Sequence, residues 1–96
     1  MALDITVTRE ADECIVCVNG EVDVSNAAEL RSALEAALTG GTSKITADFS
    51  DVSYIDSTGI GVLVGIAHRA QEARVVFVVA HPQKNVARVF DLLGVT

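Results

Sequence analysis

The chain of 96 residues has no tryptophan and contains only three phenylalanines and one tyrosine. So few aromatic rings exclude a platform on which the bases of a nucleic acid could stack. Basic residues are also scarce: seven Lys and Arg stand against 13 Asp and Glu, and the net charge of −6 repels nucleic acids and anionic membrane surfaces. We therefore expect any macromolecular partner to be a protein with a basic surface.

Long apolar runs are missing as well. No run reaches the ~18 residues that a membrane-spanning helix needs. The N-terminal residues lack the basic and apolar pattern of a secretion signal. A chain of this length has room for a single domain. These absences predict a soluble, cytoplasmic, single-domain protein.

The two cysteines, Cys14 and Cys17, have the C-x-x-C spacing that zinc sites and thioredoxin-like redox sites share. They lie in a strand pattern, in which side chains three positions apart point to opposite faces, so both sulfur atoms cannot easily reach one metal ion. Thioredoxin-type pairs also need a helix N-terminus, which the pattern does not predict here. We interpret both cysteines as small apolar core residues and predict neither a metal site nor a cofactor.

Hydrophobic periodicity divides the chain into elements in the order β-β-α-β-α-β-α. The predicted strands cover residues 3–8, 14–18, 45–50 and 75–79. A short turn joins the first two as an antiparallel hairpin, and residues 20–23 are predicted to form a loop. The last strand is a continuous apolar run, typical of an inner strand covered on both faces. Because the later β-α-β passages favour parallel pairing, we predict an α/β domain with a mixed four-stranded sheet.

Cap and stop signals bound the predicted helices. Ser25 or Asn26 can cap the first helix, and Asn26 has capping-box spacing to Glu29. Gly40-Gly41 then ends this helix, because left-handed C-terminal positions favour residues without a Cβ. Pro82 is predicted to open the third helix, where its missing N–H is harmless.

The most informative stretch is Asp56-Ser57-Thr58-Gly59, which lies between the 45–50 strand and an apolar helix pattern. The first amides of a helix lack intrahelical partners and carry the positive end of the macrodipole, so an anion attached to Ser57 would meet them. The carboxyl ends of strands in open α/β sheets are also the usual place for functional groups. On local spacing alone, however, Ser57 or Thr58 serving as the helix cap is the more frequent arrangement.

The helix that follows Ser57 is apolar on more than one side. Its predicted buried stripe consists of Ile60, Leu63, Val64 and Ala67. Val62 and Ile66 lie off this stripe and are expected to be exposed, and Gly61 and Gly65 would let a partner approach closely. The alternative is a helix buried on both sides, although one sheet face in so small a domain can stay uncovered.

Enzyme motifs are incomplete in this chain. The dinucleotide pattern that Gly59-x-Gly61 begins has Val64 in place of its third glycine, and no carboxylate follows at the ribose position. The single Asp56-Ser57-Thr58-Gly59 also departs from the aspartic protease signature, which needs two facing carboxylates. His68 and His81 have no catalytic pairing in the sequence and are predicted at the surface. We therefore do not expect an enzyme.

Three segments together resemble the bacterial anti-sigma factor antagonists of the STAS domain family. They are residues 20–23 (GEVD), 48–63 (DFSDVSYIDSTGIGVL) and 89–94 (VFDLLG). The resemblance covers nearly the whole chain and implies one STAS-type domain over residues 1–96, with helices packed mainly on one face of the sheet. Relatives usually continue past the third helix into another strand and a final helix, whereas this sequence ends at Thr96, as expected of either a short member of the family or a trimmed chain. An unpaired edge is expected to promote a weak homodimer.

The resemblance implies a partner switch centred on Ser57. In the family, the serine directly after the aspartate is phosphorylated by a partner that is both anti-sigma factor and serine kinase. The unphosphorylated antagonist binds this kinase and frees the sigma factor, the phosphorylated form does not bind, and a serine phosphatase resets it. Asp23 resembles an acidic residue near the phosphosite in relatives, although a turn or cap role fits it equally well.

The partner-binding residues expected on this basis are Glu21, Asp23, Asp56, Ser57, Thr58, Gly59, Gly61, Val62 and Ile66. Other members of the family have other roles, and two of these remain alternatives. One is an accessory subunit of a membrane transport complex, and the other is a stressosome-type scaffold. The phosphorylatable Ser57 in its Ile-Asp-Ser-Thr-Gly context favours the sigma-factor antagonist.

Overall fold

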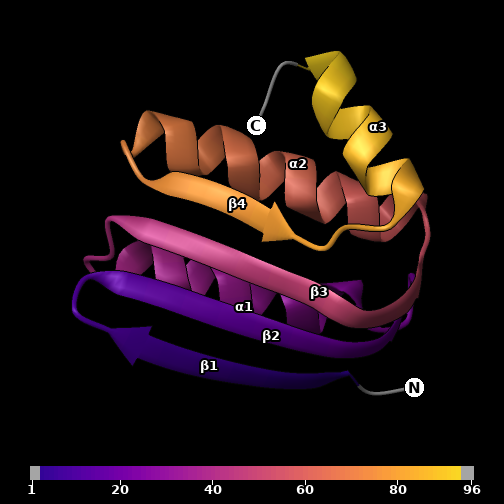
Figure 1. The fold of residues 1–96 in the computed structure, drawn as a ribbon, viewed down its shortest axis with the longest axis horizontal. Coiled ribbons are helices and arrows are strands. Elements are labelled where there is room, and N and C mark those ends of the chain that lie inside the picture. The colour runs from indigo at the N-terminus through magenta and orange to yellow at the C-terminus, as the bar shows by residue number, and fades with distance from the viewer. Residues whose placement is uncertain (1–2, 94–96) are drawn as a thin grey trace.

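The computed structural model describes residues 3–93 of the chain. Its elements are β1 (Asp4–Glu10), β2 (Glu13–Val22), α1 (Ala27–Thr39), β3 (Lys44–Ile55), α2 (Ser57–Glu72), β4 (Val76–Ala80) and α3 (Lys84–Leu93). The strands form one sheet in the order β1-β2-β3-β4, in which β1 and β2 are antiparallel and the other neighbours are parallel (Figure 1). The predicted element order and the mixed four-stranded sheet are confirmed.

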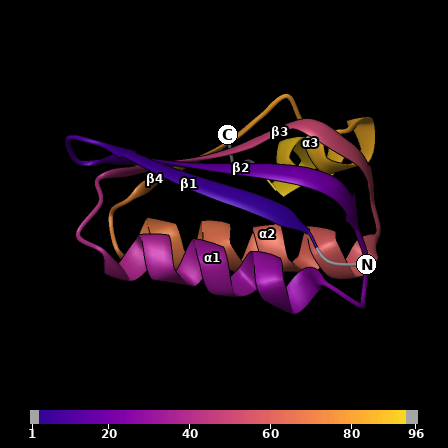
Figure 2. The ribbon, with the colours of Figure 1, turned by 90° about the horizontal axis from the view of Figure 1, so that it is seen from below.

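The helices α1 and α2 lie side by side against one face of the sheet (Figure 2). Successive side chains of a strand alternate between faces, so every second strand residue points toward this helix layer. The largest fully buried side chains of the core include Phe49, Leu30, Leu34, Ile45, Ile55 and Leu63. The opposite face, with half-buried side chains such as Ile15 and Thr46, is covered by neither of these two helices.

The third helix, α3, stands apart from the layer of α1 and α2 (Figure 2). Two amide side chains attach it to the end of β3. Gln83 Nε2 donates to the carbonyl oxygen of Val52 at 2.5 Å, and Asn85 Nδ2 donates to that of Ile55 at 3.0 Å. The sequence predicts that Pro82 opens this helix, but the helix begins two residues later, at Lys84. The carbonyl of Gln83 accepts the first helical hydrogen bond, from the N–H of Ala87.

Both central strands are longer than the sequence pattern predicts. The predicted loop at 20–23 is wrong, because β2 continues to Val22, and β3 runs on from residue 50 to Ile55. Register shifts between Cys17 and Asn19 and directly after Gly20 interrupt the alternation on which the strand prediction depends. Gly20 has a φ of +127°, which L side chains rarely adopt, and this conformation lets the strand continue.

The predicted capping box at the start of α1 is also wrong. Asn26 occupies the N-cap position, but its side chain caps no amide of the helix. Its Oδ1 atom accepts from the N–H of Asp23, and its Nδ2 atom donates to the carbonyl of Glu21. Glu29 accepts instead from the backbone N–H of Leu3 at 3.3 Å. These polar groups therefore join α1 to the two N-terminal strands.

Within the described residues, β4 is an edge strand and not the inner strand that its apolar run predicts. Phe77 points toward the helix layer and is buried, whereas Val76 points the other way and is 55% exposed. A continuous apolar run indicates apolar side chains on both faces of a strand. It does not report how many strands lie beside it, which is why the prediction failed.

The surface prediction for the histidines is confirmed, whereas the core prediction for the cysteines is confirmed for Cys14 and wrong for Cys17. Cys14 is buried and Cys17 is half-buried on the other face of β2, and both are free thiols. His68 and His81 are exposed. Among residues 3–93, no helix is both long enough and apolar enough to cross a membrane.

Candidate functional site

The carboxyl ends of β2 and β3 bring two acidic segments of the chain together. Because these strands are parallel and in register at their ends, Val22 pairs with Ile55. The backbone N–H of Asp56 then donates to the carbonyl oxygen of Val22 at 3.1 Å. The segment that carries Glu21 and Asp23 therefore lies against the start of α2.

Asp56 caps α2, and neither Ser57 nor Thr58 does. Asp56 has extended backbone angles (φ −96°, ψ −177°), and its Oδ1 atom accepts from the N–H of Gly59 at 3.0 Å. Ser57 is consequently the first residue of the helix and is exposed. Within the described chain its hydroxyl makes no hydrogen bond, so it is accessible to a modifying enzyme.

Gly59 seats the start of α2 against the ends of the two central strands. It is buried, and a Cβ at this position would lie 2.7 Å from the Cγ1 atoms of both Val22 and Ile55. Such an approach is possible only without a side chain. Gly61 and Gly65, by contrast, are exposed, and a Cβ at either would meet nothing within 4 Å.

The exposed face of α2 differs from the predicted one. Val62 and Ile66, expected at the surface, are only 4% and 2% exposed and belong to the core. The close packing at Gly59 orients the helix so that both face the sheet, whereas Ile60 and Val64 are half-buried. Because apolar residues surround much of the helix, periodicity alone does not fix its orientation. Val62 and Ile66 are thus excluded as direct partner contacts.

The turn between β2 and α1 is held by its own polar groups. Asp23 Oδ1 accepts from the backbone N–H of Ser25 at 2.9 Å and from the Ser25 hydroxyl. The buried Asn26 side chain accepts from the N–H of Asp23 at 2.9 Å and donates to the carbonyl of Glu21 at 2.8 Å. The hydrogen bonds from Ser25 hold the pKa of Asp23 below its ordinary value, so its carboxylate is ionised at neutral pH.

The site carries the carboxylates of Glu21, Asp23 and Asp56. No Lys or Arg of residues 3–93 forms an ion pair with Glu21, Asp23 or Asp56. In the same part of the chain, no group of three or more His, Cys, Asp or Glu side chains is arranged to hold a metal ion. These carboxylates lie at the same end of the sheet as the exposed Ser57 and complement a basic protein surface, which agrees with the partner expected from composition.

The fold and the site together define a small α/β domain with an accessible serine where a strand passes into a helix. The sequence profile of the STAS domain matches residues 3–96. The chain therefore belongs to the STAS domain family, and the resemblance found in the sequence is confirmed.

Relatives agree with this assignment. The anti-sigma-B factor antagonist of Staphylococcus epidermidis is 31% identical over 94 residues, which are 98% of this chain and 87% of that protein. The anti-sigma factor antagonist SpoIIAA in its unphosphorylated form is 19% identical, with a TM-score of 0.79 over 93% of this chain and 83% of that one. The Bacillus cell fate determinant SpoIIAA in the phosphorylated form is also 19% identical, with a TM-score of 0.78 over 96% and 85%. The two solved structures establish the shared fold.

The sequence did not predict the roles of two residues at the site. Val24 projects from the β2–α1 turn into solvent, and Asn26 is a buried amide that links the turn to the end of β2. A single apolar residue within a polar turn leaves no periodic signal. The sequence did single out Asn26, as a possible helix cap. Its side chain, however, forms hydrogen bonds with the turn and not with the helix amides.

Proposed function

We propose that this chain is an anti-sigma factor antagonist whose binding to an anti-sigma factor serine kinase is switched by phosphorylation of Ser57. The observation that carries the proposal is the exposed Ser57 hydroxyl, which makes no hydrogen bond within residues 3–93 and begins a helix. The name of the staphylococcal relative and the existence of SpoIIAA in both phosphorylated and unphosphorylated forms support it.

In the unphosphorylated form, the carboxyl end of the sheet binds the kinase and thereby releases the sigma factor. Glu21, Asp23 and Asp56 supply negative charge to basic groups of the kinase. Thr58 and Gly61 lie on the exposed side of α2, where the absence of a side chain at Gly61 permits close approach. The apolar contribution comes from the half-buried Ile60 and Val64, which replace Val62 and Ile66 in this role. Gly59 is a positioning residue, since it is buried.

Phosphorylation itself requires little from this chain beyond an accessible oxygen. The Ser57 oxygen attacks the γ-phosphorus of ATP held by the kinase, the new oxygen–phosphorus bond replaces the bond to ADP, and the hydroxyl proton passes to a base of the kinase. Because Asp56 already accepts from the Gly59 N–H, the amides of Ser57 and Thr58 remain to face the phosphate. A serine phosphatase later uses water to restore the hydroxyl and release inorganic phosphate.

The phosphate ends binding through charge and volume. It adds about −1.5 to −2 charges beside Asp56 and Asp23. A closely packed interface around Ser57 then has to desolvate a dianion and accommodate three additional oxygen atoms, both of which oppose docking. No hydrogen bond of the chain involves the Ser57 side chain within the described residues, so this switch needs no change of fold.

The test is a phosphorylation assay with the whole chain. The protein is incubated with ATP and, in turn, each anti-sigma-type serine kinase encoded in the same genome, and phosphate is located by mass spectrometry. We expect one kinase to modify Ser57, with Ser57→Ala unmodified and the adjacent Thr58→Ala modified as in the parent chain. If no kinase modifies Ser57, the proposal is wrong, and the transport-subunit and scaffold roles within the family become the leading alternatives.

A further inference from the structure

We infer that Val24 is the apolar anchor of the partner interface, inserted into an apolar pocket of the kinase whose rim is basic. This inference rests on the proposed function and names a contact within it. Val24 is 76% exposed, compared with 49% for Val7 and 55% for Val76, the other exposed valines of the described chain. Single exposed apolar residues are common on protein surfaces, so exposure alone does not identify a contact.

The first additional observation is the rigidity of the turn that carries Val24. Both of its neighbours along the chain are fixed: Asp23 Oδ1 accepts two hydrogen bonds from Ser25, and the Asp23 carbonyl accepts from the N–H groups of Asn26 and Ala27 at 3.1 and 2.9 Å. The N–H of Asp23 donates to the Asn26 side chain. Val24 is therefore presented on a preorganised backbone, and its β-branched side chain loses little freedom on burial.

The second observation is position. Val22, two residues before Val24, accepts a hydrogen bond from the N–H of Asp56, and its side chain lies against Gly59. Val24 therefore projects from the same end of the sheet as Ser57. The carboxylates of Glu21 and Asp23 precede it in the chain without a cation partner among residues 3–93. An apolar centre with a charged rim is the arrangement of binding hot spots, and here it specifies an apolar pocket with Lys and Arg around it.

The expected effect follows from the methyl groups that a pocket would bury. Val24→Ala removes two of them, so the Kd is expected to rise roughly tenfold. Val24→Thr keeps the shape of the side chain and replaces one methyl by a hydroxyl, so a pocket without a hydrogen-bond partner rejects it to a similar extent. Neither change touches a buried contact, because the side chain is exposed.

The experiment measures the Kd of the full chain for the kinase that phosphorylates Ser57, by titration calorimetry in the presence of ADP. The variants are Val24→Ala and Val24→Thr, with Val76→Ala on β4 as the matched control. The KM and kcat for Ser57 phosphorylation are measured in parallel, and a thermal unfolding curve confirms that each variant is folded. We expect both Val24 variants to raise Kd about tenfold and to raise KM with kcat unchanged, while Val76→Ala changes neither.

The possible outcomes separate this inference from the function on which it rests. If the parent chain is phosphorylated at Ser57 and binds its kinase, but Val24→Ala binds equally well, the anchor is refuted and the switch stands. A loss shared by Val24→Ala and Val76→Ala also refutes it, because the effect is then not specific to the site. If no kinase phosphorylates the parent chain, the proposed function fails and the anchor fails with it.

Discussion

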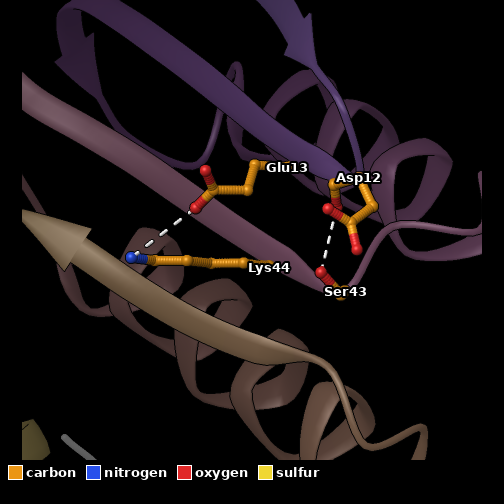
Figure 3. A network of polar contacts seen from close by, with 4 residues as sticks. All are labelled: Asp12, Glu13, Ser43 and Lys44. Atoms are coloured by element: carbon orange, nitrogen blue, oxygen red, sulfur yellow. Dashed lines mark hydrogen bonds and ion pairs between the residues drawn. The ribbon is translucent and has the colours of Figure 1, made fainter.

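The two ends of the β2–β3 strand pair differ in whether their acidic side chains form ion pairs. At the amino end, the Glu13 carboxylate lies 3.8 Å from the Lys44 ammonium, and Ser43 donates its N–H and its hydroxyl to the Asp12 carbonyl at 2.7 and 3.2 Å (Figure 3). At the carboxyl end, three carboxylates have no cation among the residues that the structure describes. The acidic groups there accept from backbone N–H groups or face solvent.

The difference separates a structural end from an end available for binding. At the amino end, the Glu13 carboxylate is paired with Lys44, and the hydrogen bonds from Ser43 fix the loop between α1 and β3. An exposed ion pair of this kind contributes only about 0–1 kcal/mol to stability. The carboxyl end keeps three carboxylates without a cation among the described residues and carries the exposed Ser57, an arrangement that complements a basic surface.

The largest effect that tests this comparison is expected at Ser57. Ser57→Asp places a charge in the closely packed contact and should raise the Kd for the kinase at least a hundredfold, the cost of burying an unpaired charge. Ser57→Ala should bind as the parent chain does, because its hydroxyl makes no hydrogen bond within residues 3–93. Calorimetric titration of each variant with the kinase measures both values. Equal affinities for the two variants would contradict the electrostatic account.

A second prediction contrasts two glycines of α2. Gly59→Ala places a Cβ 2.7 Å from side-chain atoms of Val22 and Ile55 and should lower the free energy of unfolding by about 1–3 kcal/mol, as overpacking does. Gly61→Ala meets no atom within 4 Å and should raise it by about 0.5–1 kcal/mol, because alanine loses less backbone freedom in a helix. Urea unfolding curves measure both. A Gly59→Ala variant as stable as the parent chain would show that Gly59 does not seat the helix.

A smaller effect is expected when one charge is removed at each end of the strand pair. Glu21→Gln should slow association with the kinase and raise Kd by roughly two- to fivefold, the effect of an exposed interface charge. Its matched control at the amino end, Glu13→Gln, should leave the association rate unchanged. Stopped-flow binding at several salt concentrations measures this difference, which should shrink as ionic strength rises. Equal effects of the two substitutions would remove the distinction between the ends.

The smallest effect concerns the protonation of Asp23. Its pKa is held below the ordinary value of 3.8 by the hydrogen bonds from the Ser25 hydroxyl and N–H. A carboxylate with a lowered pKa in the folded state stabilises that state fully above the unfolded pKa, and the stabilisation is lost as the pH falls through the folded value. The turn should therefore be unchanged from pH 7 down to about 5. NMR titration of the Ser25 amide should give a midpoint below 3.8; a midpoint at or above that value would show that the bonds do not form in solution.

The order of the elements could be predicted from the sequence because each depends on local periodicity. The hairpin, the amphipathic helices and the opposite orientation of Cys14 and Cys17 follow from side-chain alternation. The carboxyl-end position of Ser57 follows from the strand–helix order. The end of β2 did not follow, because a register shift after Gly20 breaks the alternation while pairing with β3 continues.

The orientation of α2 and the identity of its cap depended on tertiary contacts. Three successive residues, Asp56, Ser57 and Thr58, are all good caps, and the structure places the helix start at the first, where Asp56 bonds to Val22 and Gly59 packs against Val22 and Ile55. The same packing orients Val62 and Ile66 toward the core. The sequence does not predict this orientation, because the helix is apolar on several sides. Contacts between elements that are distant along the chain determined both features.

The capping of α2 by Asp56 also separates the residue that holds the helix start from the proposed phosphorylation site. The side chain that holds the helix start and the side chain open to modification are different residues, one position apart. The proposed phosphorylation of Ser57 would therefore leave the cap bond between Asp56 and the Gly59 N–H in place. On the proposed function, the chain would then return to its original state after each phosphorylation and dephosphorylation without refolding.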